Sequence, residues 1–491
     1  MARLRGRDIF LLDGIPELCR VVLDELAADG AIPAVQGAIR HYVQRHLSDP
    51  LLLERLKCAC VNCLAGTSSI KAALSGVTGH ELAQALERLL RHRQIQFFLA
   101  TEQIVADLEN GVDCGYLTQR LPANVIDWVG HAIHGQARPL EHLHTLLRGR
   151  PAKHAMVASL LCRADPSWVP VSKPPPRLAG AYLEDAAWRG ACLAGADMAE
   201  SDLSGADLCD AELSRANVSR ARLRRARVSG AKLLHLRAKN CQAAFADMSS
   251  VQAYRAVFEQ TNLSRANFSN ACLQGVAFTG AVLNGASFRN ADLRQAQLTG
   301  TAVEEADFTN ADLDGADLSN LDLRTATLRG ARFARANLVK SNFEYMELPN
   351  ADFNGANLFG ALLTGTTMPN GSFRGASLQE AGLADIEWEG AILCGADLRG
   401  ASFHLGSSRS GRVYSPIACE GSRTGFYTDD YDELYFKAPE EIRKANLCRA
   451  DLRGANVTNV DFYLVDLRGA LYDRDQAEHF RRCGAILEAR V

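Results

Sequence analysis

Three cysteines lie close together in the segment KCACVNC, as Cys58, Cys60 and Cys63. Thiolates at such short spacing bind zinc when a fourth ligand completes the tetrahedron, and His46 or His80 could supply it. No second CxxC follows, and a spacing of two residues places Cys58 and Cys60 on different sides of a helix. We therefore favour cysteines that pack within a helix, and we expect no metal and no other cofactor.

No other group of residues indicates catalysis. The motifs GxxxxGK[ST], HExxH and GxSxG do not occur. His131, His134, His142 and His144 form a loose group, but no acidic residue accompanies them in a recognised metal-binding pattern. We expect exposed histidines on helices and a protein that is not an enzyme. A metal-dependent activity in residues 1–164 is the alternative from the enzyme class.

Charge is banded along the middle of the chain. Residues 184–212 carry eight acids and one arginine, residues 215–239 carry nine basic residues and no acid, and residues 304–322 carry seven acids and no base. The basic band supplies our first candidate binding residues: Arg220, Arg222, Arg224, Arg225 and Arg227. They would suit an acidic partner, phosphates or lipid headgroups. Alternatively, neighbouring acidic and basic bands neutralise one another, which we favour because exposed charges are kept at little energetic cost.

The elements that position these residues change after residue 164. Residues 1–164 have apolar residues at helical spacing, as in Leu18, Val22 and Leu26, and we predict an all-α domain of roughly seven to nine helices. Residues 165–176 include five prolines, which exclude a helix and favour an extended, stiff linker.

From Leu178 to Phe403 the sequence repeats every five residues without a slip. The central position is almost always large and apolar, a small residue stands two positions earlier, and Asp or Asn often lies between them. Helices repeat at about 3.6 residues and strands at 2, so neither explains the pattern. Each pentad is therefore one short extended side plus a corner, with its central and small residues facing inward. About four such pentads close a coil of about twenty residues, and coils stack at about 4.8 Å.

A coil of twenty residues predicts that side chains twenty positions apart lie over one another. Three ladders of rings should result: Phe268, Phe288 and Phe308; Phe333, Phe353 and Phe373; Phe258 and Phe278. In one region the large and small positions are exchanged, with Ala238 and Ala253 at the centre and Leu236 and Val251 two positions earlier. We predict a distorted coil at residues 234–256.

Repeats such as ADLDG, SDLSG, ANFSN and ANLFG resemble those of the pentapeptide repeat protein family. The resemblance covers about half of the chain. It implies a right-handed quadrilateral parallel β-helix over residues 177–403 and 444–472. Members of this family are mostly bacterial proteins that bind other proteins. Some protect DNA gyrase by imitating duplex DNA, and others are effectors delivered into host cells.

The repeat is interrupted at residues 404–443 and resumes with its phase shifted by one residue. The interruption interleaves aromatic and acidic residues and supplies our second group of candidate binding residues: Tyr427, Asp429, Asp430, Tyr431, Tyr435 and Phe436. Aromatic side chains give large contact areas at low entropic cost, so this segment suits recognition. Equally, its rings could pack on the solenoid.

Residues 473–491 have the signals of a final helix, with Asp473 at the N-cap, Gln476 three residues later and Gly484 at the C-cap. We predict that this helix caps the open end of the solenoid. A homodimer through the cap is the alternative. About twenty residues follow the last repeat, too few for the ubiquitin-ligase domain of some family effectors, so we take Cys483 as a helix residue rather than a nucleophile.

The predicted fold is thus α+β with several domains: an all-α domain, a linker, a long β-helix with one insertion, and a helical cap. A net charge of −3 gives no general attraction to nucleic acid, and no apolar run is long enough for a membrane span. We predict a non-enzymatic, cytoplasmic, bacterial scaffold that binds another protein. The alternatives are an effector translocated by a specialised secretion system and a gyrase-protection protein, against which the basic band argues.

Overall fold

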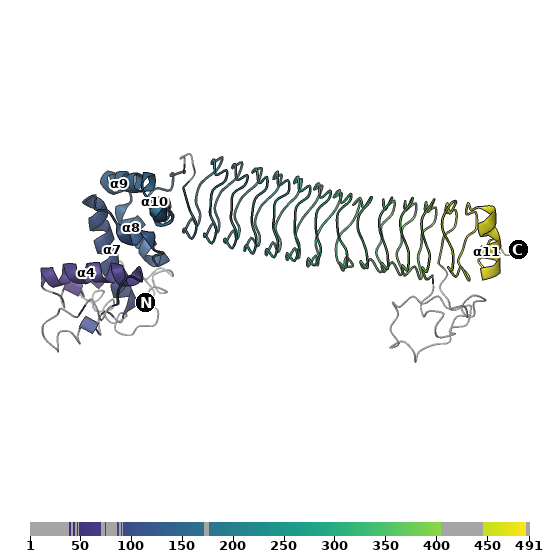
Figure 1. Cartoon of the computed structure of the whole chain (residues 1–491), viewed down its shortest axis with the longest axis horizontal. Helices are drawn as coiled ribbons and strands as arrows, with labels where there is room; N and C mark the ends of the chain where they lie inside the picture. Colours follow the sequence, from purple (N-terminus) through teal and green to yellow (C-terminus); the bar gives the residue numbers. More distant parts are fainter. Residues whose placement is uncertain are drawn as a thin grey trace, which may run out of the picture. The chain divides into compact units, whose positions relative to one another are not determined.

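The structure is a computed structural model. It describes residues 49–69, 92–170, 176–403 and 445–487, together with positions 39, 40, 43, 44, 47, 74, 86, 87 and 90. Contacts divide the chain into two compact units, Met1–Ala187 and Trp188–Val491. Figure 1 shows helices in the first unit and a long stack of coils in the second.

The first unit is mainly helical. It contains α4 (Pro50–Leu64), α7 (Arg93–Glu109), α8 (Ala123–Ile133), α9 (Ala137–Arg148) and α10 (His154–Ala164), and the 3-10 helices η1 (Gly115–Thr118) and η2 (Pro151–Lys153). The Asp49 carboxylate caps α4 by accepting hydrogen bonds from the N–H groups of Leu51 and Leu52. α7 packs against α4, α8 and α9, and α10 packs against α8 and α9. The predicted helical region is therefore present.

The core of this unit lies among these helices. Leu99 and Ile104 of α7, Ile126 of α8 and Leu161 of α10 have no exposed side-chain surface. Burial of such side chains is the main source of stability for helices of this length. The apolar stripe predicted at residues 18–26 lies outside the described residues.

The first pentads belong to the helical unit. The backbone N–H of Tyr182 donates to Ser159 Oγ on α10 at 2.8 Å. Arg163, also on α10, forms ion pairs with Asp127 of α8 (2.6 Å) and with Glu184 in a pentad (2.5 Å). These contacts attach the start of the solenoid to α8 and α10 within this unit.

The solenoid is held together by parallel bridges between residues twenty positions apart. Asp292 pairs with Asp312, which pairs with Arg332, which pairs with Asp352. Each pentad contributes one bridging residue, and no longer strand occurs in the described pentads. Because a pentad has five residues, four pentads make one coil, and the predicted coil of twenty is confirmed.

The repeated residue types have local structural roles. Asp or Asn before the central residue accepts a hydrogen bond from the N–H two residues later, as Asn267 does from Ser269 (3.1 Å). This turn stabilises each corner. The last corner residue has positive φ, for example 66° at Gly315 and 57° at Asn310, which explains why Gly and Asn are common there.

The phenylalanine ladders fill the interior. Phe288 stacks on Phe268, with ring centroids 5.2 Å apart, and on Phe308, at 5.0 Å. Phe258 and Phe278 form the predicted second stack at 5.6 Å. Phe278 also meets Phe268 and Phe288 edge to face at 5.7 and 5.8 Å, so the two ladders interleave. The third predicted ladder is present too: Phe333, Phe353 and Phe373.

The prediction of a distorted coil at residues 234–256 is wrong. The bridges from Arg237 to Val257 and from Gln252 to Cys272 continue without a break. Leu236 is buried beside Ala238, and both point inward. Exchange of the large and small positions keeps the interior volume nearly constant, so the backbone has no reason to shift.

After the interruption the coils continue in register. Asn446 pairs with Glu387, and Asp461 pairs with Ser402. If a segment as long as residues 404–442 were removed, the two residues of each pair would be twenty positions apart, as they are elsewhere in the solenoid. The interruption is therefore an insertion of that length at the corner after Phe403, and the order of the sides is unchanged.

The solenoid ends with a helix and one more pairing residue. α11 (Arg474–Cys483) follows the last pentads, and Ile486 then pairs with Asp466. Figure 1 shows α11 in yellow beside the final coils.

Candidate functional site

Four of the nine basic residues in the band form ion pairs with the preceding coil. Each pair joins residues twenty positions apart: Arg220–Glu200 (3.3 Å), Arg222–Asp202 (3.2 Å), Arg227–Asp207 (3.2 Å) and Lys232–Glu212 (3.8 Å). Stacking in coils of twenty brings each side chain over its partner. The pairs support the interpretation that the acidic and basic bands neutralise one another.

Arg215, Arg224, Arg225 and Arg237 form no ion pair among the described residues, and only Arg224 and Arg225 of these four are adjacent in sequence. Both side chains are exposed, and neither has a carboxylate within 4.0 Å among the described residues. They occupy a corner, and the equivalent residues of the preceding coil are Ser204 and Gly205, which carry no charge. This pair therefore retains positive charge that an external ligand can use.

The second group of candidate residues lies in the interruption, outside the described residues. It comprises Tyr427, Asp429, Asp430, Tyr431, Tyr435 and Phe436. Their role in binding stays a prediction.

The acidic band at residues 304–322 is also partly neutralised. Four of its seven acids lie within 4.0 Å of an arginine: Asp307 near Arg289, Asp312 near Arg332, Asp314 near Arg335 and Asp322 near Arg324. A row of free carboxylates, as DNA mimicry would need, is therefore interrupted by bound guanidinium groups.

One recurring pair was missed in the sequence. The triplet Asp-Leu-Arg places the guanidinium on the carboxylate two residues earlier: Asp292–Arg294, Asp322–Arg324, Asp397–Arg399, Asp451–Arg453 and Asp466–Arg468. The hydrogen bond from Arg399 is the main reason why the pKa of the Asp397 carboxyl is lowered. The triplet itself was the available signal, because Arg stands at the corner that follows the inward Leu and its side chain reaches back to the carboxylate two residues earlier.

The cysteine cluster lies on α4, as predicted. Cys60 is buried, and burial raises the pKa of its thiol to about 12. Cys58 is exposed and its Sγ donates to Gln103 Oε1 at 3.3 Å. Within the described residues, no three His, Cys, Asp or Glu side chains gather in a group that could hold a metal ion. The two suggested fourth ligands, His46 and His80, lie outside them.

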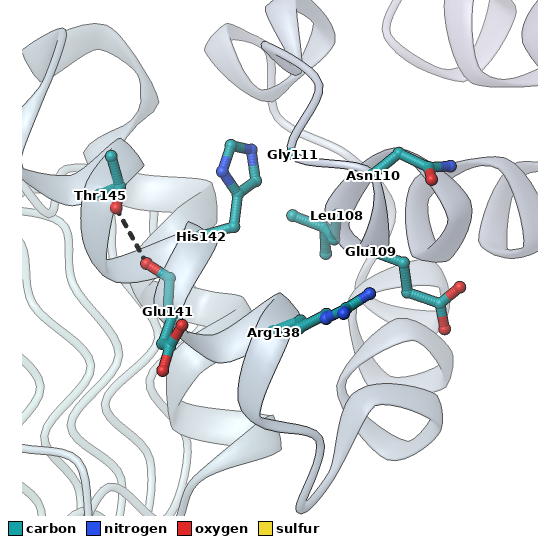
Figure 2. A pocket seen from close by; sticks show the side chains of 8 residues that line it. All are labelled: Leu108, Glu109, Asn110, Gly111, Arg138, Glu141, His142 and Thr145. Atoms are coloured by element: carbon teal, nitrogen blue, oxygen red, sulfur yellow. Dashed lines mark hydrogen bonds between the residues drawn. The ribbon is translucent and has the colours of Figure 1, made fainter.

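The histidines bind separate backbone carbonyls. His134 Nδ1 lies 2.7 Å from the carbonyl oxygen of Ala164, and His142 Nε2 lies 2.9 Å from that of Val112. His142 borders a shallow, open pocket of about 380 Å³ between the end of α7 and α9 (Figure 2). The pocket is lined by Leu108, Glu109, Asn110, Gly111, Arg138, Glu141, His142 and Thr145. The hydrogen bond drawn there runs from the Thr145 hydroxyl to the Glu141 carbonyl and stabilises α9 itself.

Cys483 is buried on α11, and burial raises the pKa of its thiol. His479 Nε2 lies 3.6 Å from the sulfur. A thiol whose ionisation is disfavoured is a poor nucleophile, so the Cys–His proximity does not indicate catalysis. Of the helices in the described part of the chain, none has the length and apolar character of a membrane span.

Comparisons with known proteins match the repeats. A family model described as a pentapeptide repeat region matches residues 251–328. A second, described as pentapeptide repeats, matches several segments: 177–215, 191–230, 316–355, 326–365, 356–386, 372–405 and 442–469. No curated protein sequence matches the chain.

Solved structures match as well. HetL of Nostoc sp. strain PCC 7120, a pentapeptide repeat protein involved in heterocyst differentiation regulation, is 26% identical; the match covers 45% of this chain and 84% of HetL, with a TM-score of 0.19. QnrB1, a plasmid-mediated fluoroquinolone resistance protein, is 19% identical over 39% of this chain and 89% of QnrB1, with a TM-score of 0.25. A thylakoid lumen pentapeptide repeat protein of Arabidopsis thaliana is 26% identical over 28% of this chain and 63% of its own, with a TM-score of 0.11.

Proposed function

Because the chain belongs to the pentapeptide repeat family, we propose that it is a non-enzymatic scaffold that binds another protein through the surface of its solenoid. The inward positions of each pentad fill the core, and the Asp or Asn beside them holds the turn. Corner side chains that form no ion pair with a neighbouring coil are left to contact another protein. Stacked coils with interleaved rings provide a rigid surface, and rigid surfaces lose little conformational entropy on binding.

The observation that carries the proposal is the uncompensated pair Arg224 and Arg225. Four other basic residues of the band pair with acids one coil earlier, and Lys239 pairs with Glu259 one coil later, whereas these two adjacent arginines have no such partner among the described residues. Exposed arginines with several free donors are frequent anchors in protein interfaces. An acidic surface on a partner would supply the missing carboxylates.

A quantitative pull-down tests the proposal. The intact chain serves as bait, beside the double variant Arg224→Ser/Arg225→Gly, which copies the preceding coil. Arg329→Ser is the matched control, because Arg329 is also an exposed corner arginine without an ion pair among the described residues. We expect one bound protein to be retained by the control and lost by the double variant. Failure of the intact chain to retain any protein would refute the proposed function.

The finer features of the fold are part of the same proposal. We infer a right-handed, quadrilateral coil that α11 closes. Gln476 Nε2 donates to the carbonyl oxygens of Leu452 (2.9 Å) and Ala455 (2.8 Å), and Asp473 accepts from the N–H of Gly454 (2.6 Å). These bonds supply partners for backbone groups of the last coils, which is what a cap must do. Removal of α11 should therefore cause association of the solenoid ends, measurable by light scattering.

Gyrase protection is the competing function that an assay separates most directly. The arginine-bound carboxylates of residues 304–322 favour the scaffold over DNA mimicry. Inhibition of supercoiling by micromolar purified protein would reverse that preference. Translocation into a host cell is a separate question of delivery, and a secretion reporter fused to the chain would answer it.

A further inference from the structure

One corner of the solenoid has an unusual choice of residues. Every coil has four corners, and the last residue of most corners has positive φ, a conformation that bulky residues rarely adopt. Among the described residues, three large apolar side chains occur in this conformation: Phe245 (61°), Tyr345 (62°) and Leu464 (58°). A position with this geometry favours Gly or Asn.

All three lie on the same corner. Tyr345 stands five coils after Phe245. Leu464 is two residues after the pentad centre Phe462, and the pentad of Phe462 pairs with that of Phe403. Phe403 lies eight coils after the centre of the Phe245 pentad, so Leu464 is on the same corner. We name it the Phe245 corner. It consists of the two residues that follow each pentad centre at 203, 223, 243 and every twentieth position to 383, and of the two residues that follow the centre at 462.

The next corner along the coil shows the ordinary solution. Asn270, Asn290 and Asn310 have φ values of 54° to 60°, and their amides bond in a ladder, at 3.3 Å from Asn290 to Asn270 and 3.2 Å from Asn310 to Asn290. On the Phe245 corner, by contrast, Phe245 is 44% exposed and Tyr345 is 69% exposed. Backbone strain together with exposed apolar surface brings no benefit to the fold, and such strain is typical of functional sites.

Positive charge surrounds Phe245. Arg225 and Arg265 stand one coil before and one coil after it on the same corner, and Arg265 Cζ lies 5.9 Å from the centre of the Phe245 ring. Arg224 is adjacent to Arg225. None of these three arginines has a carboxylate within 4.0 Å in the part of the chain that the structure describes. The Phe245 ring thus lies between Arg225 and Arg265 along the corner, and neither guanidinium has an ion-pair partner among the described residues.

We propose that the Phe245 corner is the recognition edge of the solenoid, and that Arg225, Phe245 and Arg265 bind an acidic, extended segment of the partner protein. This inference rests on the proposed function. The two arginines are two coils apart, about 10 Å. This is close to the rise of about 9 Å over three residues of an extended polyproline II segment, in which side chains three positions apart lie on the same face. The segment therefore carries two carboxylates three residues apart with an apolar side chain between them. The carboxylates meet the guanidinium forks and the apolar side chain meets the ring.

The charge farther along the corner favours a peptide over a nucleic acid. Glu304 and Glu305 stand two coils beyond Arg265 on the same corner. A phosphate backbone that followed the edge would meet these carboxylates, whereas a peptide can change the sign of its own charge at that point.

The binding test uses the full chain and a labelled peptide that contains the motif Glu-Ser-Leu-Glu, with fluorescence anisotropy as the readout. Phe245→Asn keeps a residue that tolerates positive φ, and Arg225→Gly/Arg265→Gly copies the glycines found elsewhere on the corner. Arg255→Gly is the matched control, because Arg255 has positive φ and a ring contact to Tyr254 on a different corner. We expect about fivefold weaker binding by the Phe245 variant and about tenfold by the double variant. The control should bind like the natural chain.

Three outcomes would overturn the inference. The peptide could bind all variants equally, a Gln-Ser-Leu-Gln peptide could bind as tightly, or a thymidine oligonucleotide could bind more tightly than the acidic peptide. The pull-down separates this failure from that of the proposed function. Equal capture of one protein by the natural chain and by both corner variants would reject the edge and keep the scaffold, whereas no capture at all would reject both. A raised thermal midpoint in Phe245→Asn would verify that the variant is folded.

Discussion

The register across the interruption predicts which deletion the solenoid tolerates. Bridges from Glu387 to Asn446 and from Ser402 to Asp461 show that the chain resumes as if a segment as long as 404–442 were absent. Deletion of residues 404–442 restores the spacing of twenty and leaves residues 443–444 to form the corner before Ala445. We expect the shortened chain to fold with every downstream bridge in place.

The magnitude follows from loop entropy and burial. Replacing a connection of about 41 residues by a two-residue corner removes a loop-closure cost of at most about 3 kcal/mol, so stability should stay equal or rise. Deletion of residues 404–443 instead leaves a single residue for the corner, and it shifts the register of all residues after the corner by one position. Leu447, Leu452, Phe462 and Leu467 then leave their inward positions, at about 1.5–3 kcal/mol each. The loss of about 6–12 kcal/mol exceeds what these last coils can sustain.

Hydrogen exchange of residues 445–487 distinguishes the two deletions. Protection should match the natural chain when 404–442 is removed and disappear when 404–443 is removed. Urea unfolding of both proteins provides the free energies. Equal protection and equal stability in the two deletions would refute the register and with it the role of the inward positions.

Four further predictions follow from single contacts. Phe288→Ala should lower the unfolding free energy by about 3–5 kcal/mol and Phe288→Leu by about 1 kcal/mol, because Leu fills the same position in other coils; urea titration measures both. Arg163→Ala should lower exchange protection of residues 178–187 by about 1–3 kcal/mol, since two carboxylates lose their partner. Arg399 lowers the folded-state pKa of Asp397, so the ionised Asp397 stabilises the fold fully above about pH 4, and this stabilisation is lost as the pH falls further. Asp397→Asn should therefore lower the thermal midpoint at pH 7 and reduce the decrease of that midpoint on acidification. Phe245→Asn should raise the unfolding free energy by about 1 kcal/mol, and an unchanged or lowered value in urea would contradict the argument from strain.

The coil could be predicted because the sequence repeats the structure itself. Phe268, Phe288 and Phe308 are equivalent by spacing, and equivalent positions in a stack must lie over one another. The same logic applied to charges would have found the pairing of Arg220 with Glu200 and Arg222 with Asp202. Charge was instead compared between whole bands, which hides pairs at a fixed spacing of twenty.

Other features depend on packing that no single repeat contains. The edge-to-face contacts of Phe278 with Phe268 and Phe288 arise because opposite sides of the coil are offset, and the period alone does not fix that offset. The distorted coil expected at residues 234–256 is absent, because the exchange of Leu236 and Ala238 conserves their summed volume and that volume governs the backbone. The ion pairs of Arg163 with Asp127 and Glu184 have no signal in the sequence, because they join helices to a pentad.

The structural roles of the five positions in a pentad determine which side chains are available for binding. A solenoid needs its central and small residues for the core, and it needs the Asp or Asn between them for the turn. A side chain at that third position can still reach its neighbour twenty residues away, which is why Arg222 pairs with Asp202 and is committed to the fold. Arg225 stands only three residues later, at a corner whose equivalents one coil earlier, Ser204 and Gly205, carry no charge, and it has no carboxylate within 4.0 Å among the described residues. Recognition in such a rod should therefore change by substitution at corners, and variants at Arg222 should alter stability where variants at Arg225 alter binding.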